Sequence, residues 1–128
     1  EIARSYVGTR FHHEGRAPGV GLGCAGVAIC AARAVGLMVR DGVPYPRRAN
    51  GALVPLIADQ MQPIAIADLQ LADVLVMTFD NQPHHVALYA GATIIHAYLQ
   101  VKKTVEQPYI DYWRGKVVGA YRFREFVA

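Results

Sequence analysis

The sequence predicts an α+β domain in which N-terminal helices pack on a small antiparallel sheet. Small and aliphatic residues from Cys24 to Leu37 predict a buried helix near the start of the chain. Residues 71–79, 84–91 and 92–98 are rich in β-branched and aliphatic side chains and are separated by turn-forming residues, which is typical of strands in a meander. Because the helices precede the strands instead of alternating with them, the order argues against repeated βαβ units.

Length and composition indicate one folded domain spanning residues 1–128. The chain has 128 residues, of which 53% are hydrophobic and 18% are charged. This length allows a substantial core but is small for two domains. The hydrophobic content also argues against disorder in any part of the chain.

The first half of the chain is expected to contain helices joined by polar segments. The central helix begins at Cys24, is nearly apolar on all sides, and is expected to end near Gly36. The other elements expected in this half are a short helix over residues 2–7, a glycine-rich loop over 8–23, a surface connection over 41–51, a short helix over 51–60 and a loop that begins at Pro63.

After the three-strand meander, the chain is expected to form one more helix and one more strand. Residues 108–116 begin with a proline and predict a short helix. Residues 116–123, KVVGAYRF, predict a final strand.

The charge pattern gives little support to nucleic-acid or membrane binding. Thirteen Lys and Arg against ten Asp and Glu leave a net charge of +3, and the basic residues are scattered. No recognisable nucleic-acid motif is present. No apolar stretch reaches the roughly 18 residues needed to span a bilayer, and no signal-peptide pattern opens the chain. We therefore expect no nucleic-acid partner and no membrane anchor.

Cys24 lies between glycines at the predicted start of the central helix, in the stretch GLGCAG. The partial positive charge of a helix N-terminus lowers the pKa of a cysteine, and the thiolate is the nucleophile. The alternative is that Cys24 is a small core residue. Cys30 follows six residues later, about 240° around the helix, so a disulfide between the two is disfavoured and Cys30 is interpreted as a buried hydrophobe.

A cysteine nucleophile needs a base, and the strand region holds three of the five histidines. Strand alternation places His85 on one face and His84 on the other, so the two do not share a role. A hairpin turn near Gly91 brings His96 close to His85. The residues therefore leave two interpretations open: a cysteine with a histidine base and a second histidine behind it, or isolated polar residues on strands.

Zinc is the competing use for Cys24, His84, His85 and His96, because thiolate and imidazole are its preferred ligands. However, the sequence contains no CxxC, HxxxH or HExxH pattern. We expect no metal and no organic cofactor. His12 and His13 in the glycine-rich loop are interpreted as cleft or loop-packing residues.

The order of motifs resembles that of the NlpC-type cell-wall cysteine peptidases. The motifs are YVGTRFHHEG, GLGCAGV, LADVLV, HHVALYAG, IIHAY and VVGAYRF, and together they extend over nearly the whole chain. The resemblance is greatest to the phage branch, whose members are often tail-associated. It implies a papain-like α+β fold, Cys24 as nucleophile, His85 as general base and His96 as the residue that orients the base.

The resemblance also implies a substrate and a location. The family hydrolyses an amide in the peptide stem of peptidoglycan, typically the γ-D-glutamyl bond to a diamino acid. The resemblance to the phage branch implies a location at a virion tail tip or baseplate, or outside the cytoplasm, with tail proteins as partners. The family usually has Asp-Cys-Ser-Gly at the nucleophile, whereas this chain has Gly23-Cys24-Ala25-Gly26, and Phe11 replaces a loop tyrosine. The residues expected to line the substrate site are Phe11, His12, His13, Gly23, Ala25 and His84.

Two further functions remain open on these residues. A structural tail protein that has lost its activity would explain the missing polar neighbours of Cys24. An acyltransferase or deamidase would use the same cysteine and histidines on a different acyl group.

Overall fold

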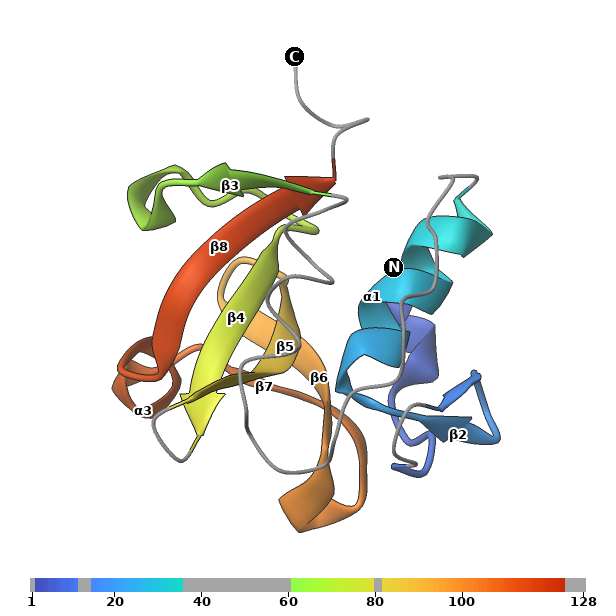
Figure 1. Ribbon diagram of the computed structural model, residues 1–128. Coiled ribbons are helices and arrows are strands. Elements are labelled where there is room, and N and C mark those ends of the chain that lie inside the picture. The colour runs from blue at the N-terminus through green and yellow to red at the C-terminus, as the bar shows by residue number, and fades with distance from the viewer. Residues whose placement is uncertain (1, 12–14, 36–60, 80–81, 124–128) are drawn as a thin grey trace.

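The computed structural model describes residues 2–11, 15–35, 61–79 and 82–123. In this part of the chain, one α-helix of three turns lies beside a curved antiparallel sheet (Figure 1). The helical elements are η1 (Ala3–Tyr6), α1 (Cys24–Ala34), η2 (Ile66–Asp68), η3 (Leu99–Val101) and α3 (Asp111–Arg114). The strands are β1 (Arg16–Ala17), β2 (Gly21–Leu22), β3 (Met61–Ile64), β4 (Val74–Phe79), β5 (Gln82–Tyr89), β6 (Thr93–Tyr98), β7 (Lys103–Pro108) and β8 (Val117–Phe123).

The main sheet has six strands in the order β3-β8-β4-β5-β6-β7, and every neighbouring pair is antiparallel. The predicted meander is present as β4, β5 and β6, and the predicted final strand is present as β8. The turn between β5 and β6 contains Gly91 with a positive φ of 88°, a conformation that glycine adopts without steric strain. A separate two-stranded sheet pairs β1 with β2 inside the segment expected to be a loop.

The strands at both edges of the main sheet were not predicted. β3 contains Pro63, which was expected to begin a loop, and β7 is a polar segment, KTVEQP. An edge strand tolerates proline and polar side chains because one side of it makes no ladder hydrogen bonds. The expected helix over 108–116 is shorter, because β7 continues to Pro108 and α3 begins only at Asp111. The helix expected over 51–60 lies outside the described residues.

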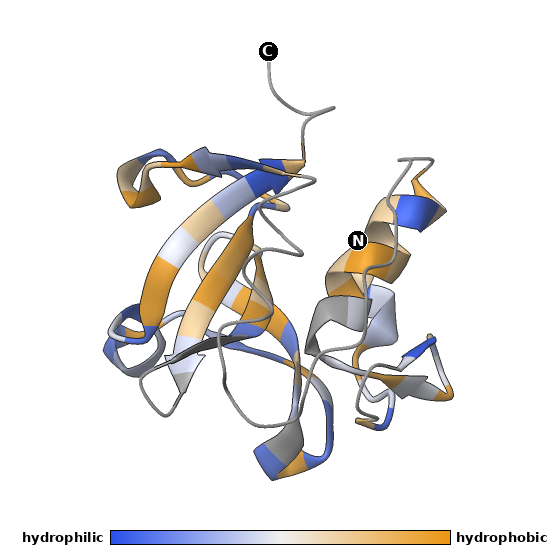
Figure 2. Cartoon of the chain, in the orientation of Figure 1, coloured by the Kyte–Doolittle hydropathy of each residue, from blue (hydrophilic) through white to orange (hydrophobic). Residues whose placement is uncertain are grey.

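Two apolar clusters occupy the two faces of the sheet. α1 contributes Val27, Ala28 and Ala32 to the first cluster, which also contains Val86 and Leu88 of β5. The second cluster contains the alternate residues of the same strands together with Trp113 of α3; its other members are Leu75, Met77, Ala87, Ile94, Tyr98, Tyr109 and Ala120. β4 is buried on both faces, which accounts for its continuous apolar sequence, and Figure 2 shows the apolar residues of α1 and β4.

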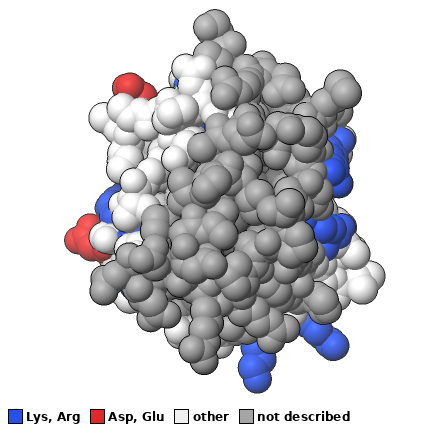
Figure 3. All heavy atoms as spheres, viewed as in Figure 1, with Lys and Arg blue, Asp and Glu red and all other residues white. Residues whose placement is uncertain are grey.

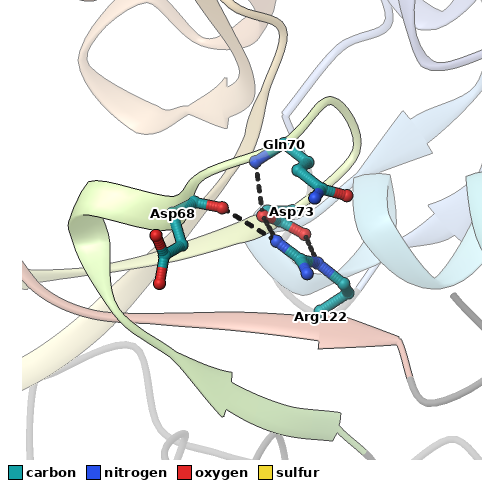
Figure 4. A network of polar contacts seen from close by, with 4 residues as sticks. All are labelled: Asp68, Gln70, Asp73 and Arg122. Carbon is teal, nitrogen blue, oxygen red and sulfur yellow. Dashed lines mark hydrogen bonds and ion pairs between the residues drawn. The ribbon is translucent and has the colours of Figure 1, made fainter. Parts of the chain in front are cut away.

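A buried ion pair joins the turn before β4 to the last strand. The carboxylate of Asp73 is 1% exposed and accepts two hydrogen bonds from Arg122, at 2.8 Å from Nε and 2.9 Å from Nη2. The backbone N–H of Gln70 donates to the same carboxylate at 2.7 Å, and Arg122 also donates to the carbonyl oxygen of Asp68 (Figure 4). These contacts satisfy a charge that would be costly to bury alone.

The described basic residues do not form one continuous field on the face seen in Figure 3. Lys and Arg side chains lie at several separate places around its rim. This arrangement agrees with the scattered basic residues and small net charge of the sequence.

Candidate active site

Cys24 is the first residue of α1, as the sequence predicts, and Gly23 caps the helix with an extended backbone. Gly23 is buried, and its N–H donates to the carbonyl oxygen of Gly15 at 3.1 Å. An α-helix of this length directs its first N–H groups and a partial positive charge outward from its N-terminus. The backbone therefore places Cys24 where a thiolate is stabilised; the side chains of Cys24 and Ala25 lie outside the described part.

Cys30 lies on α1, six residues after Cys24. Its burial is only partial, and its Sγ donates to the carbonyl oxygen of Arg16 at 3.3 Å. The interpretation of Cys30 as a buried hydrophobe holds in part, because the residue packs against the first apolar cluster but is only partly buried. It is a half-buried thiol that ties α1 to the preceding segment.

Phe11 lies in the segment before the helix and is half-buried. Its N–H donates to the carbonyl oxygen of Lys102 at 2.9 Å, and its backbone bridges Leu22. The ring packs against the first apolar cluster. The neighbouring His12 and His13, which were expected at the substrate site, lie outside the described residues.

His85 on β5 and His96 on β6 are in direct contact. The Nε2 atom of His85 lies 2.7 Å from the Nδ1 atom of His96, and the two side chains are 5% and 0% exposed. The hairpin therefore brings together the pair that the sequence spacing indicated. His84 belongs to β5, but its side chain lies outside the described part.

A β-bulge immediately precedes His85. Met77 of β4 pairs with His85, whereas the next residue, Thr78, pairs with Pro83, so His84 has no partner in the register. Bulges bend a strand and redirect side chains, and they are frequent beside active sites. After the bulge, alternate residues of β5 belong to different clusters. Val86 and Leu88 pack with α1 in the first cluster, whereas His85 and His96 contact Tyr98, which belongs to the second cluster.

Gln107 extends the histidine pair, although sequence reasoning did not identify it. Its Oε1 lies 2.7 Å from Nε2 of His96, so His85, His96 and Gln107 form one hydrogen-bonded chain across three strands. The register pairs His96 with Val105, which makes Gln107 a diagonal neighbour on the same face of the sheet. Recognising 103–108 as a strand is the signal that would have placed Gln107 beside His96.

Aromatic side chains enclose His96. Tyr98 stacks on its ring at 5.1 Å with an interplanar angle of 10°, and Trp113 approaches edge-on at 4.9 Å and 89°. Burial lowers the pKa of His96 below the usual histidine value, and the hydrogen bond with Gln107 acts in the opposite direction. His96 is therefore a neutral ring at neutral pH, held in one orientation.

Among the described residues, no group of three or more His, Cys, Asp or Glu side chains is arranged to hold a metal ion. No helix in the described ranges is long and apolar enough to cross a membrane. The chemistry that the histidine pair offers is proton transfer through imidazoles.

Comparison with solved structures identifies the architecture. A protein of the NLP/P60 family from Staphylococcus aureus, described as similar to a lipoprotein, superimposes with a TM-score of 0.67 and 23% identity over 94% of this chain. An NlpC/P60 family protein from Bacillus cereus gives a TM-score of 0.70 at 21% identity over the same share. The chain has the NlpC/P60 fold.

The NlpC/P60 fold also includes the NlpC/p60 domain of the peptidoglycan hydrolase SagA, with a TM-score of 0.68 and 20% identity. The match covers 94% of this chain and 92% of the SagA domain, but only 38% and 37% of the S. aureus and B. cereus chains. Neither a protein-family model nor a curated protein sequence matches this chain. At these identities the likeness is one of fold, and it agrees with the predicted mostly antiparallel α+β class.

Proposed function

We propose that this chain is a cysteine hydrolase that cleaves an amide bond in the peptide stem of peptidoglycan. The observation that carries the proposal is the buried chain of His85, His96 and Gln107 in a fold that starts its central helix with Cys24. A buried imidazole pair joined to a polar side chain is suited to holding a general base in one orientation. The solved relative SagA, named as a peptidoglycan hydrolase, supports the substrate class.

In the proposed reaction, His85 takes the proton of the Cys24 thiol and the thiolate attacks the amide carbonyl carbon. The backbone N–H of Cys24 at the helix start stabilises the negative charge that develops on the carbonyl oxygen. His85 then gives its proton to the leaving amine as the C–N bond breaks, which leaves a thioester on Cys24. Water adds to the thioester with His85 as base, and a carboxylic acid and the free thiol are released.

The resemblance of the sequence motifs suggests finer features of this proposal. The bond is the γ-D-glutamyl amide to a diamino acid, and the enzyme acts outside the cytoplasm, at the tail tip or baseplate of a phage that penetrates the wall. The substrate contacts involve Phe11, His12, His13, His84 and the residues that flank Cys24. Gly23 and Ala25 replace the polar neighbours usual in the family, so the amino end of the stem is held by other groups.

Digestion of purified sacculi tests the proposal. The wild-type chain is expected to release fragments with a new free amino group on the diamino acid, and Cys24→Ala is expected to release none. Cys30→Ser is the matched control, because serine keeps the hydrogen bond to the carbonyl oxygen of Arg16 while removing the other thiol. Equal release by wild type and Cys24→Ala would rule out cysteine hydrolysis.

Mass spectrometry of the products separates hydrolysis from related reactions. Hydrolysis splits a stem peptide and adds the elements of water across the two fragments. A transferase would join a fragment to another amine, and a deamidase would convert a side-chain or terminal amide to an acid without splitting the stem. Only the first pattern agrees with the proposal.

A structural tail protein is the second function, and the replacement of both polar neighbours of Cys24 by Gly23 and Ala25 favours it. A structural role predicts stable binding to tail-tip or baseplate proteins by both wild type and Cys24→Ala. It also predicts no release of peptides from sacculi by either chain. The same digestion experiment therefore separates the two functions.

A further inference from the structure

We propose that Gln107 is a positioning residue that fixes the proton positions of both histidines and so makes Nδ1 of His85 the basic atom. This inference rests on the proposed function insofar as it concerns catalysis. The proton positions themselves are a property of the folded chain without substrate.

The argument starts from the donor and acceptor atoms. The amide oxygen of Gln107 only accepts hydrogen bonds, and it lies 2.7 Å from Nε2 of His96. Nε2 of His96 therefore carries a hydrogen. Because His96 is neutral in its buried position, its Nδ1 atom has a lone pair and acts as an acceptor.

The same reasoning applies to the next hydrogen bond, between His96 and His85. Nδ1 of His96 lies 2.7 Å from Nε2 of His85, so Nε2 of His85 must carry the hydrogen of that bond. The neutral His85 ring then has its lone pair on Nδ1, the atom that would accept the thiol proton. If the amide nitrogen of Gln107 faced His96 instead, every donor would reverse and Nδ1 of His85 would be protonated.

Packing supports Gln107 as the residue that decides between these two patterns. Tyr98 stacks on the His96 ring and Trp113 meets it edge-on, so the ring has little freedom to exchange its two nitrogens. Gln107 lies on the edge strand β7 and is half-buried, diagonally opposite His96. A change at Gln107 therefore alters the acceptor while leaving the aromatic packing around His96 in place.

Nitrogen NMR of histidine-labelled protein tests the inference directly, since protonated and unprotonated ring nitrogens differ in chemical shift. In a Cys24→Ala background, where no thiol proton can move to His85, His85 and His96 are both expected to be protonated on Nε2 at neutral pH. Gln107→Leu removes the acceptor and is expected to give a mixture of proton positions. Gln107→Glu keeps an acceptor oxygen and is expected to retain protonation of both rings on Nε2. Gln100→Leu, at an exposed position of η3, is the matched control and should change nothing.

The kinetic arm uses the same Gln107 variants, with Cys24 in place, on sacculi. Gln107→Leu is expected to lower kcat about tenfold with little change in KM, the size expected from losing one buried hydrogen bond, and Gln107→Glu is expected to recover most of that loss. Protonation of His96 on Nδ1 with Gln107 in place would overturn the inference, as would unchanged proton positions in Gln107→Leu. Because the NMR arm needs no turnover, failure of hydrolysis and failure of this inference remain distinguishable.

Discussion

Gly26 packs so closely against Gly15 that a Cβ atom on Gly26 would lie 2.1 Å from the Gly15 carbonyl oxygen. The same oxygen accepts the N–H of Gly23 at 3.1 Å and the guanidinium of Arg16 at 3.0 Å. The segment before α1 is therefore fastened to the first turn of the helix, next to Cys24. Glycine at position 26 is required by this close approach and not by its backbone angles.

Replacing Gly26 by alanine is expected to lower the free energy of unfolding by about 1–3 kcal/mol, because backbone must move to relieve the contact. Alanine has the higher intrinsic helix propensity, so a helix without this contact would be stabilised instead. Chemical denaturation measures the change. The control is Gly119→Ala in β8, where a Cβ would meet only side-chain atoms of Tyr121, the nearest at 3.4 Å. A Gly26→Ala chain as stable as the control would contradict the packing described.

Glu106 on β7 is expected to make stability depend on pH in the acid range. Its carboxylate accepts hydrogen bonds from Arg4 at 2.8 and 2.9 Å and from the hydroxyl of Thr93 at 2.6 Å. The hydrogen bonds from Arg4, then from Thr93, lower the pKa of Glu106 from 4.5 to about 2. Between about pH 2 and pH 4.5 the unfolded chain binds more protons than the folded chain. The stability that Glu106 contributes is therefore complete above about pH 4.5 and is lost as the pH falls through about 2.

Glu106→Gln removes this dependence. The variant is expected to be about 1 kcal/mol less stable than wild type at pH 6, a modest value because Arg4 is half-exposed, and the difference should shrink toward pH 2. Thermal unfolding at a series of pH values measures it. Asp111→Asn breaks an exposed ion pair with Arg114 at 3.5 Å and should show almost no difference at any pH. A Glu106→Gln deficit that stays constant down to pH 2 would contradict the prediction.

The sequence predicted the interior of the fold better than its edges. β4, β5, β6 and β8 are central strands with apolar patterns, and α1 is an apolar helix, so each follows from hydrophobicity alone. β3 and β7 are the two edge strands, and their sequences, MQPI and KTVEQP, carry the proline and charges that edges tolerate. Local sequence cannot distinguish such strands from loops, because their pairing depends on a neighbour distant in the chain.

The difference between local and distant pairing also explains which residues of the site were predicted. His85 and His96 lie on adjacent strands of one hairpin, so their spacing along the chain was enough to bring them together. Gln107 and Trp113 reach His96 from β7 and α3, and neither element was predicted with the right bounds. The bulge before His85 depends on the register between β4 and β5, which the residues of β5 do not reveal alone.

The most direct test of the central claim is the rate of Cys24 alkylation as a function of pH, because it asks whether Cys24 and His85 act as one unit. The measurement uses a Cys30→Ser background, so that a small alkylating reagent reports on one thiol. The midpoint of the profile is expected between about pH 4 and 7, well below the value of about 8.5 for an ordinary thiol. Adding His85→Ala is expected to move the midpoint back toward about 8.5. A midpoint near 8.5 in both chains would show that Cys24 is an ordinary thiol and would contradict the claim.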